Sequence, residues 1–317
     1  VVVRAAAATL QKYENIELLL VGDEDELKTL VGSIIGDDPR VKIRPASEVV
    51  AMSEAPAEAL RKKKDSSMRV ALDLVKAGEA DACVSAGNTG ALMATARFVL
   101  KMLPGIDRPA IIAELPAIGG SLHMLDLGAN TEGTAEHLFQ YALMGSIVAA
   151  DISGIESPRV ALLNIGAEDI KGSDTVKEAA AVLNDSTLNY VGFIEGNELF
   201  SGKADVVVTD GFTGNVALKT MEGTVGLARH YMRRAFTRGW FAKLQAALAG
   251  QVLRRLATEM DSRNYNGATL VGLNAIVIKS HGSADAYAFQ HAIDTAVVEV
   301  RNQLPTQIRQ LLEEESA

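Results

Sequence analysis

Five short loops in the sequence combine glycine with small polar residues. Each follows a predicted β-strand, and most of them lead into a predicted helix. Glycine lets the backbone approach a ligand closely, and the first N–H groups of a helix attract an anion. Ligands of doubly wound sheets bind beyond the carboxyl ends of the strands, so the loops together predict a phosphate-type cleft. The loops are residues 85–90, 126–130, 164–166, 210–215 and 280–282.

No loop matches a nucleotide-binding fingerprint, a nucleophile elbow or a compact zinc-ligand set. Cys83, the single cysteine, lies in an apolar strand, where we expect an unreactive buried thiol. Lys279 and His281 end a strand and enter a glycine-flanked loop, where they can steady an anion or transfer a proton. The sequence therefore predicts an anion site without a protein nucleophile. This combination favours a reaction in which bound inorganic phosphate is the attacking group.

Short β-rich runs alternate with longer helical patterns through most of the chain. Strands that are apolar on both faces and alternate with helices predict a mainly parallel, doubly wound sheet. No repeat, low-complexity tract or linker divides the chain, so we expect one α/β domain over residues 1–317. The main predicted strands are residues 16–21, 41–46, 82–85, 110–115, 123–127, 159–165, 190–194, 204–209 and 269–278; the main predicted helices are residues 1–10, 67–77, 89–101, 134–149, 173–183 and 215–236.

The composition excludes several classes of protein. The 317 residues carry 31 Lys and Arg against 40 Asp and Glu, a formal charge of −9. Coating of nucleic acid is therefore excluded, because it needs a basic surface. A single cysteine forms no internal disulfide and suits a reducing, cytoplasmic location. No apolar run approaches the roughly 18–20 residues of a membrane span.

Residues 229–258 depart from the acidic average, with seven basic residues and no acidic one. Their apolar residues recur near helical spacing, which predicts a basic amphipathic helical segment. Three interpretations remain open: a helix packed on the core, a docking site for an acidic partner, or a site for anionic lipid headgroups. The absence of Asp and Glu from this segment favours the docking site for an acidic partner and the site for anionic lipid headgroups. The residues assigned to binding are Arg233, Arg234, Arg238, Trp240, Phe241, Leu244 and Leu248.

Several runs resemble the bacterial phosphate acyltransferases of phospholipid synthesis, the PlsX family. They are residues 85–93 (SAGNTGALM), 103–110 (LPGIDRPA), 125–130 (LDLGAN), 161–166 (ALLNIG), 210–223 (DGFTGNVALKTMEG), 265–268 (YNGA) and 278–282 (IKSHG). The resemblance implies an open three-layer α/β/α sandwich, similar to isopropylmalate dehydrogenase and phosphotransacetylase. It implies transfer of a fatty acyl group from acyl carrier protein to inorganic phosphate, without metal or organic cofactor. The acyl phosphate would then serve a membrane-bound glycerol-3-phosphate acyltransferase.

The resemblance also implies a homodimer and a cytoplasmic enzyme that associates peripherally with the membrane. Members of the family begin with a strand that ends in a loop of the type Asp-Ala-Met-Gly-Gly-Asp, which this chain does not contain. Val1 already lies within a predicted helix, so we expect that an N-terminal strand and its glycine-rich loop are missing from this copy.

Together, the loops and the resemblance suggest a role for each candidate residue. Phosphate would attack the thioester directly, while asparagine side chains and backbone N–H groups hold the oxyanion. Asp210 would orient a donor or accept a proton, and Lys171 and Lys219 would pair with phosphate groups; a plain surface ion pair is the alternative for Lys219. The catalytic candidates are Asn88, Asp210, Asn215, Lys279 and His281. The substrate-binding candidates are Ser85, Gly87, Thr89, Gly90, Asp126, Asn130, Asn164, Lys171, Gly214 and Lys219.

Three other functions remain as alternatives. A phosphotransacetylase that uses acyl-coenzyme A would need similar groups. A dehydrogenase of the related fold is less favoured, because no cluster of metal-binding carboxylates stands out. A scaffold of lipid synthesis with impaired catalysis is the third.

Overall fold

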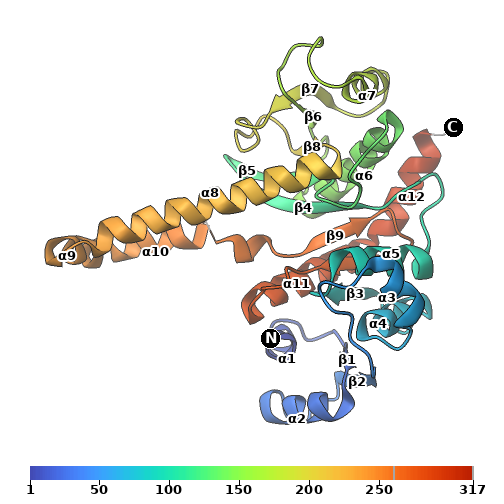
Figure 1. Cartoon of the computed structure of the whole chain (residues 1–317), viewed down its shortest axis with the longest axis vertical. Coiled ribbons are helices and arrows are strands. Elements are labelled where there is room, and N and C mark those ends of the chain that lie inside the picture. Colours follow the sequence, from blue (N-terminus) through green and yellow to red (C-terminus); the bar gives the residue numbers. More distant parts are fainter. Residues whose placement is uncertain (260, 316–317) are drawn as a thin grey trace.

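A mixed sheet of eight strands runs through the structure, with helices on both faces (Figure 1). The computed structural model describes residues 1–259 and 261–315, apart from the side chains of residues 243, 244, 254, 256, 257, 259, 262 and 315. The strand order is β3 (Ala82–Ser85), β10 (Ile276–Lys279), β9 (Ala268–Val271), β4 (Ala110–Ala117), β5 (Gly120–Leu125), β8 (Val206–Val208), β6 (Val160–Asn164) and β7 (Tyr190–Glu195). The three-layer α/β/α arrangement that the resemblance implies is confirmed.

The strands bury apolar side chains on both faces, so each face needs its own helices. One face carries α3 (Pro56–Lys62), α4 (Ser67–Lys76) and α5 (Thr89–Leu100) near β3, and α8 (Gly211–Thr237) over β4 and β5. The other face carries α6 (Ala135–Ser153), α7 (Asp174–Asn184), α11 (Ala286–Asn302) and α12 (Leu304–Glu315). A smaller unit contains α1 (Val2–Lys12), α2 (Glu24–Ile34) and the parallel pair β1 (Leu18–Gly22) and β2 (Val41–Pro45).

The centre of the sheet is antiparallel. The pairs β10–β9, β9–β4 and β4–β5 run antiparallel, whereas β3–β10 and the ladder of β5, β8, β6 and β7 run parallel. The carboxyl ends of β3 and β10 therefore point in one direction along the strands, and those of β5, β8 and β6 point in the opposite direction. We call the two sides of the sheet at which the strands end its two edges. The strands that lead into the five glycine loops therefore do not all point in the same direction. Loops 85–90 and 280–282 lie at the first edge, and loops 126–130, 164–166 and 210–215 lie at the second.

The predicted strand over residues 269–278 is also wrong, because it is two strands. Strand β9 ends at Val271, and Gly272 turns the chain with φ at 92°, a conformation that favours glycine. The side-chain amide of Asn274 then donates to the Met102 carbonyl at 2.8 Å, before β10 begins at Ile276. The residues of the turn are mostly apolar, so hydrophobicity alone does not reveal it.

The predicted basic segment forms a helical hairpin that extends away from the sheet (Figure 1). It consists of the end of α8, then α9 (Trp240–Leu248) and α10 (Gly250–Glu259), with a break at Gly239, where φ is 91°. A short 3-10 helix, η1 (Ser262–Tyr265), returns the chain to β9. The helical part of the prediction is confirmed. No helix of the described residues is long and apolar enough to cross a membrane.

Candidate active site

Two neighbouring loops meet at the edge where β3 and β10 end. Ser85 pairs directly with Lys279 in the parallel ladder, and the Ser280 N–H donates to the Ser85 carbonyl at 2.9 Å. Helix α5 starts just after the first loop, and α11 starts just after the second. The first N–H groups of both helices lack partners within the helix, so this edge attracts an anion.

Lys279 is the charged group at the centre of this edge. Its side chain is only 9% exposed, and its ammonium donates to the Ser280 carbonyl. Burial, together with the positive charge of Lys219, lowers the pKa of Lys279 to about 8. No carboxylate of the described side chains pairs with this ammonium, and a buried unpaired cation is costly, so an anion bound beside it would be stabilised.

Lys219 brings a second cation from α8. Its ammonium lies 2.8 Å from a Glu222 carboxylate oxygen, and both side chains are about half exposed. This is the surface ion pair that the sequence left open as an alternative. Because Lys219 also acts on the pKa of Lys279, it contributes to the positive potential of the site as well.

The first loop offers its hydroxyl groups and backbone N–H groups. The Ser85 hydroxyl oxygen accepts from the Gly87 N–H at 3.2 Å, which leaves the hydroxyl hydrogen to donate. A side chain at Gly87 would lie 2.9 Å from the Met68 methyl, and one at Gly90 would lie 2.9 Å from a Pro56 ring carbon. Packing against α3 and α4 therefore accounts for both glycines. Thr89 and Gly90 are the first two residues of α5 and present unpaired helical N–H groups.

The Asn88 side chain has a structural task. Its carbonyl oxygen accepts from the Ala91 N–H at 3.1 Å and so caps α5. Its amide nitrogen donates to the carbonyls of Ala51, Met52 and Glu54 at 2.9–3.2 Å. The predicted oxyanion donor is thus engaged within the protein.

His281 stands in the second loop. Its Nδ1 lies 3.2 Å from the Ser283 backbone nitrogen and 2.8 Å from the Ser283 hydroxyl oxygen, so Ser283 occupies this side of the ring. The backbone N–H of His281 donates to the Asn266 side chain at 2.9 Å, which fixes the loop. The exposed ring can therefore turn Nε2 toward a ligand.

At the opposite edge, Asp126 organises its own loop. The carboxylate is fully buried and accepts from the N–H groups of Ile111, Gly128 and Ala129 at 2.9–3.2 Å. It also accepts from the backbone and side chain of Asn130 at 2.7 and 3.0 Å, and Asn130 donates further to Pro109 and Tyr141. Burial raises the pKa of Asp126, and these hydrogen bonds oppose the rise. The Asp126 carboxylate and the side-chain nitrogen of Asn130 are thus engaged within the protein.

The start of α8 is built on the same loop. Asp210 caps the helix by accepting from the Thr213 N–H at 2.9 Å and from its hydroxyl at 2.7 Å. A side chain at Gly214 would lie 1.9 Å from the Asp126 carbonyl oxygen, so only glycine allows this approach. Asn215 follows on the exposed side of the helix, one turn before Lys219.

Asn164 and Lys171 lie apart from Lys279. The Asn164 amide donates to the Lys171 carbonyl at 3.2 Å and closes a local loop. Strand β6 is five positions from β10 in the sheet, about 24 Å at the usual strand spacing. The structure therefore does not bring these two residues to the site.

The hairpin carries the predicted partner-binding residues on its surface. Arg233, Arg234 and Arg238 are exposed, as are Trp240 at 78%, Phe241 at 58% and Leu248 at 81%. The side chain of Leu244 lies outside the described residues. The interpretation of this segment as a helix packed on the core does not fit so much exposed apolar surface.

Sequence reasoning missed the residues that hold the second loop. Asn266 and Ser280 lie within runs that carried the resemblance, but their side chains received no role. Arg263 and the two aspartates that it pairs with, Asp261 and Asp285, have no sequence signature beyond alternating charge. Among the described residues, no three His, Cys, Asp or Glu side chains are grouped to hold a metal ion.

Known proteins share the sequence pattern and the fold of this chain. The profile of a family described as "Fatty acid synthesis protein" matches residues 1–307. A phosphate acyltransferase of Alkalilimnicola ehrlichii is 58% identical over 314 residues, which cover 99% of this chain and 92% of the relative. One of Nitrosococcus oceani is 55% identical with the same coverage. A solved phosphotransacetylase from Streptococcus pyogenes, 20% identical, aligns with a TM-score of 0.63 over 95% of this chain and 90% of its own. This last likeness shows a shared fold alone.

Proposed function

The chain belongs to the phosphate acyltransferase family of fatty acid and phospholipid synthesis, and on this basis we propose that it transfers a long-chain fatty acyl group from acyl carrier protein to inorganic phosphate. The observation that carries the proposal is the buried Lys279 ammonium, which has no carboxylate partner among its described contacts. Lys279 pairs in the sheet with Ser85, the first residue of the loop that leads into α5. The residues around it can bind and orient phosphate.

In the proposed reaction, phosphate itself is the nucleophile. An oxygen of hydrogen phosphate bonds to the thioester carbonyl carbon, and the carbon–sulfur bond breaks. The leaving thiolate takes the proton that hydrogen phosphate releases, so acyl phosphate and the free carrier thiol are the products. Lys279 and the Thr89 and Gly90 N–H groups would bind phosphate, and His281 Nε2–H would donate to the developing oxyanion.

The test of the function is the dependence of carrier release on phosphate. With long-chain acyl carrier protein, we expect free carrier and acyl phosphate in equal amounts only when phosphate is present. Mass spectrometry of both products measures this. Release without phosphate would contradict the proposal. A strong preference for acyl-coenzyme A in competition would favour the phosphotransacetylase alternative instead.

We assign the hairpin tip to a membrane surface and the arginines near it to the acidic carrier. Trp240, Phe241 and Leu248 expose apolar surface close to basic side chains, the combination that interfacial helices use. Arg233, Arg234 and Arg238 are exposed on the hairpin, so their positive charges can attract an acidic protein. The hairpin leaves the sheet at the edge that holds Lys279, so a docked donor would be near the phosphate.

Replacing Trp240 and Leu248 together with alanine should weaken binding to anionic lipid vesicles about 100-fold. Each apolar side chain contributes roughly 1.5–3 kcal/mol when it is fully buried. Vesicle sedimentation measures the partition, and Ile118→Ala, another exposed apolar position at 78%, is the matched control. Equal loss in the control variant would contradict a specific membrane site.

The pair Arg233→Ala and Arg234→Ala should instead weaken carrier binding, most strongly at low salt.

Membership of the family also supports a proposal for the remaining partners. We propose that the protein is a cytoplasmic homodimer that associates peripherally with the membrane. Its acyl phosphate would pass to a membrane-bound glycerol-3-phosphate acyltransferase.

A further inference from the structure

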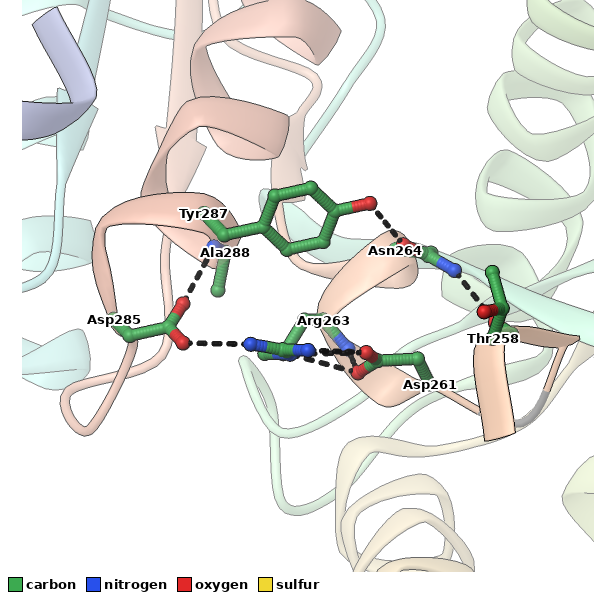
Figure 2. Close-up of polar contacts among 7 residues, drawn as sticks. All are labelled: Thr258, Asp261, Arg263, Asn264, Asp285, Tyr287 and Ala288. Atoms are coloured by element: carbon green, nitrogen blue, oxygen red, sulfur yellow. Dashed lines mark hydrogen bonds and ion pairs between the residues drawn. The ribbon is translucent and has the colours of Figure 1, made fainter. Parts of the chain in front are cut away.

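A compact polar network ties the end of the hairpin to the start of α11 (Figure 2). Arg263, in η1, is held by the Asp261 carboxylate through Nε at 3.0 Å and Nη2 at 2.6 Å. Its Nη1 donates to Asp285 at 2.9 Å. The same guanidinium lies 5.1 Å from the centre of the Tyr287 ring. One planar cation therefore joins two carboxylates and an aromatic ring from two segments of the chain.

The partners of Arg263 are themselves fixed. Asp285 caps α11 by accepting from the Ala288 N–H at 2.9 Å. The Tyr287 hydroxyl donates to the Asn264 side chain at 2.8 Å, and the Asn264 amide donates to the Thr258 carbonyl at 2.9 Å (Figure 2). The network thus links the last turn of α10 with the first turn of α11.

Asn266 holds the same loop from its other end. Its amide donates to the Ser280 hydroxyl at 2.8 Å and to the Ala288 carbonyl at 2.7 Å, and its carbonyl oxygen accepts from the His281 N–H at 2.9 Å. Since the Lys279 ammonium donates to the Ser280 carbonyl, the orientation of that peptide also determines where the ammonium lies.

We propose that Arg263 and Asn266 are positioning residues, which hold the 280–285 loop against the returning end of the hairpin and so fix Lys279 and His281 for phosphate. The inference rests on the proposed function. It also joins the proposed donor-docking hairpin to the phosphate loop through one hydrogen-bonded network.

The test compares Arg263→Ala with a matched variant, Arg159→Ala. Arg159, the residue before the distant strand β6, makes a similar bidentate pair with Asp205, at 2.9 and 2.7 Å. Exposure is also similar, 43% and 13% for that pair against 49% and 16% for Arg263 and Asp261. We expect both variants to lower the melting temperature alike. Only Arg263→Ala should raise the phosphate dissociation constant tenfold or more in equilibrium dialysis.

Two further measurements separate positioning from plain stabilisation. Amide hydrogen exchange over residues 281–288 should quicken in Arg263→Ala and remain unchanged in Arg159→Ala. Arg263→Lys should restore phosphate binding in part, because an ammonium can bind one carboxylate but lacks the planar fork. Asn266→Asp, which exchanges the donating nitrogen for an oxygen, should also raise the phosphate KM.

The results that overturn the inference differ from those that overturn the function. If the unaltered protein transfers the acyl group to phosphate but Arg263→Ala binds phosphate as Arg159→Ala does, only the inference fails. If the unaltered protein neither binds phosphate nor releases carrier, the proposed function fails and the inference falls with it. If Arg263→Ala leaves amide hydrogen exchange over residues 281–288 unchanged, the positioning role is overturned, whether or not the proposed function holds.

Discussion

Replacing Lys279 with methionine should lower kcat/KM for phosphate about 100-fold while the protein stays folded. The ammonium is the buried cation of the site, and losing one donor to a developing anion typically costs about 10²–10³ in rate. Methionine fills a similar volume and removes the cost of burying a charge, so we expect no loss of stability. Steady-state kinetics at varied phosphate, together with a thermal melt, measure both effects.

The same residue predicts how the reaction depends on pH. Below about pH 8 the Lys279 amine is protonated and can bind the anion; above that pH it loses its charge. After correction for the ionisation of phosphate, kcat/KM should therefore fall as pH rises through about 8. In Lys279→Met this decline should be absent.

Lys219→Met provides the matched control for these measurements. Its ammonium is half exposed and paired with Glu222, so we expect kcat/KM to fall only a few-fold. Because the charge of Lys219 helps to lower the pKa of Lys279, its removal should move the decline in kcat/KM to higher pH. An equal loss in both variants, or an unchanged pH profile in Lys279→Met, would contradict the role of Lys279.

Local patterns in the sequence predicted single elements well. Strand β3 has the predicted bounds, and the predicted helices over residues 67–77 and 89–101 end within one residue of α4 and α5. These elements have strong apolar periodicity, and a side chain caps each helix, Ser66 for α4 and Asn88 for α5.

Strand direction could not be predicted in the same way. Periodicity reports which residues are buried, but it does not report whether neighbouring strands run parallel. The turn at Gly272 and the hairpin between β4 and β5 reverse the chain at the centre of the sheet. As a result, the glycine loops divide between two edges, and Asn164 and Lys171 lie far from Lys279.

The roles of polar loop residues were ambiguous for a physical reason. A residue that caps a helix and a residue that binds an anion have the same chemistry, because both supply or face backbone N–H groups. Asn88 and Asp210 were therefore expected to contact substrate, whereas their side chains cap α5 and α8. Only the hydrogen-bond partners, which depend on segments distant in sequence such as residues 51–54, distinguish the two roles.

The largest expected effect on stability comes from Asp126→Ala, which should lower the free energy of unfolding by about 4 kcal/mol or more. The substitution removes the acceptor of five hydrogen bonds at a fully buried position, and each orphaned donor costs about 1–3 kcal/mol. Total stabilities of about 5–15 kcal/mol are usual, so the variant should be marginally folded. Urea unfolding followed by circular dichroism measures the change.

Two other variants determine whether Asp126 acts through the fold or through substrate. Asp126→Asn keeps the size and one acceptor oxygen, so its cost should be smaller, although its amide now faces the Asn130 N–H. Asp210→Ala removes only a helix cap and should cost about 1 kcal/mol. If Asp126→Asn kept full stability but raised the phosphate KM, Asp126 would contact substrate as the sequence first suggested. Because its carboxylate already accepts from the backbone N–H groups of its loop and from Asn130, we expect stability and not phosphate affinity to be lost first.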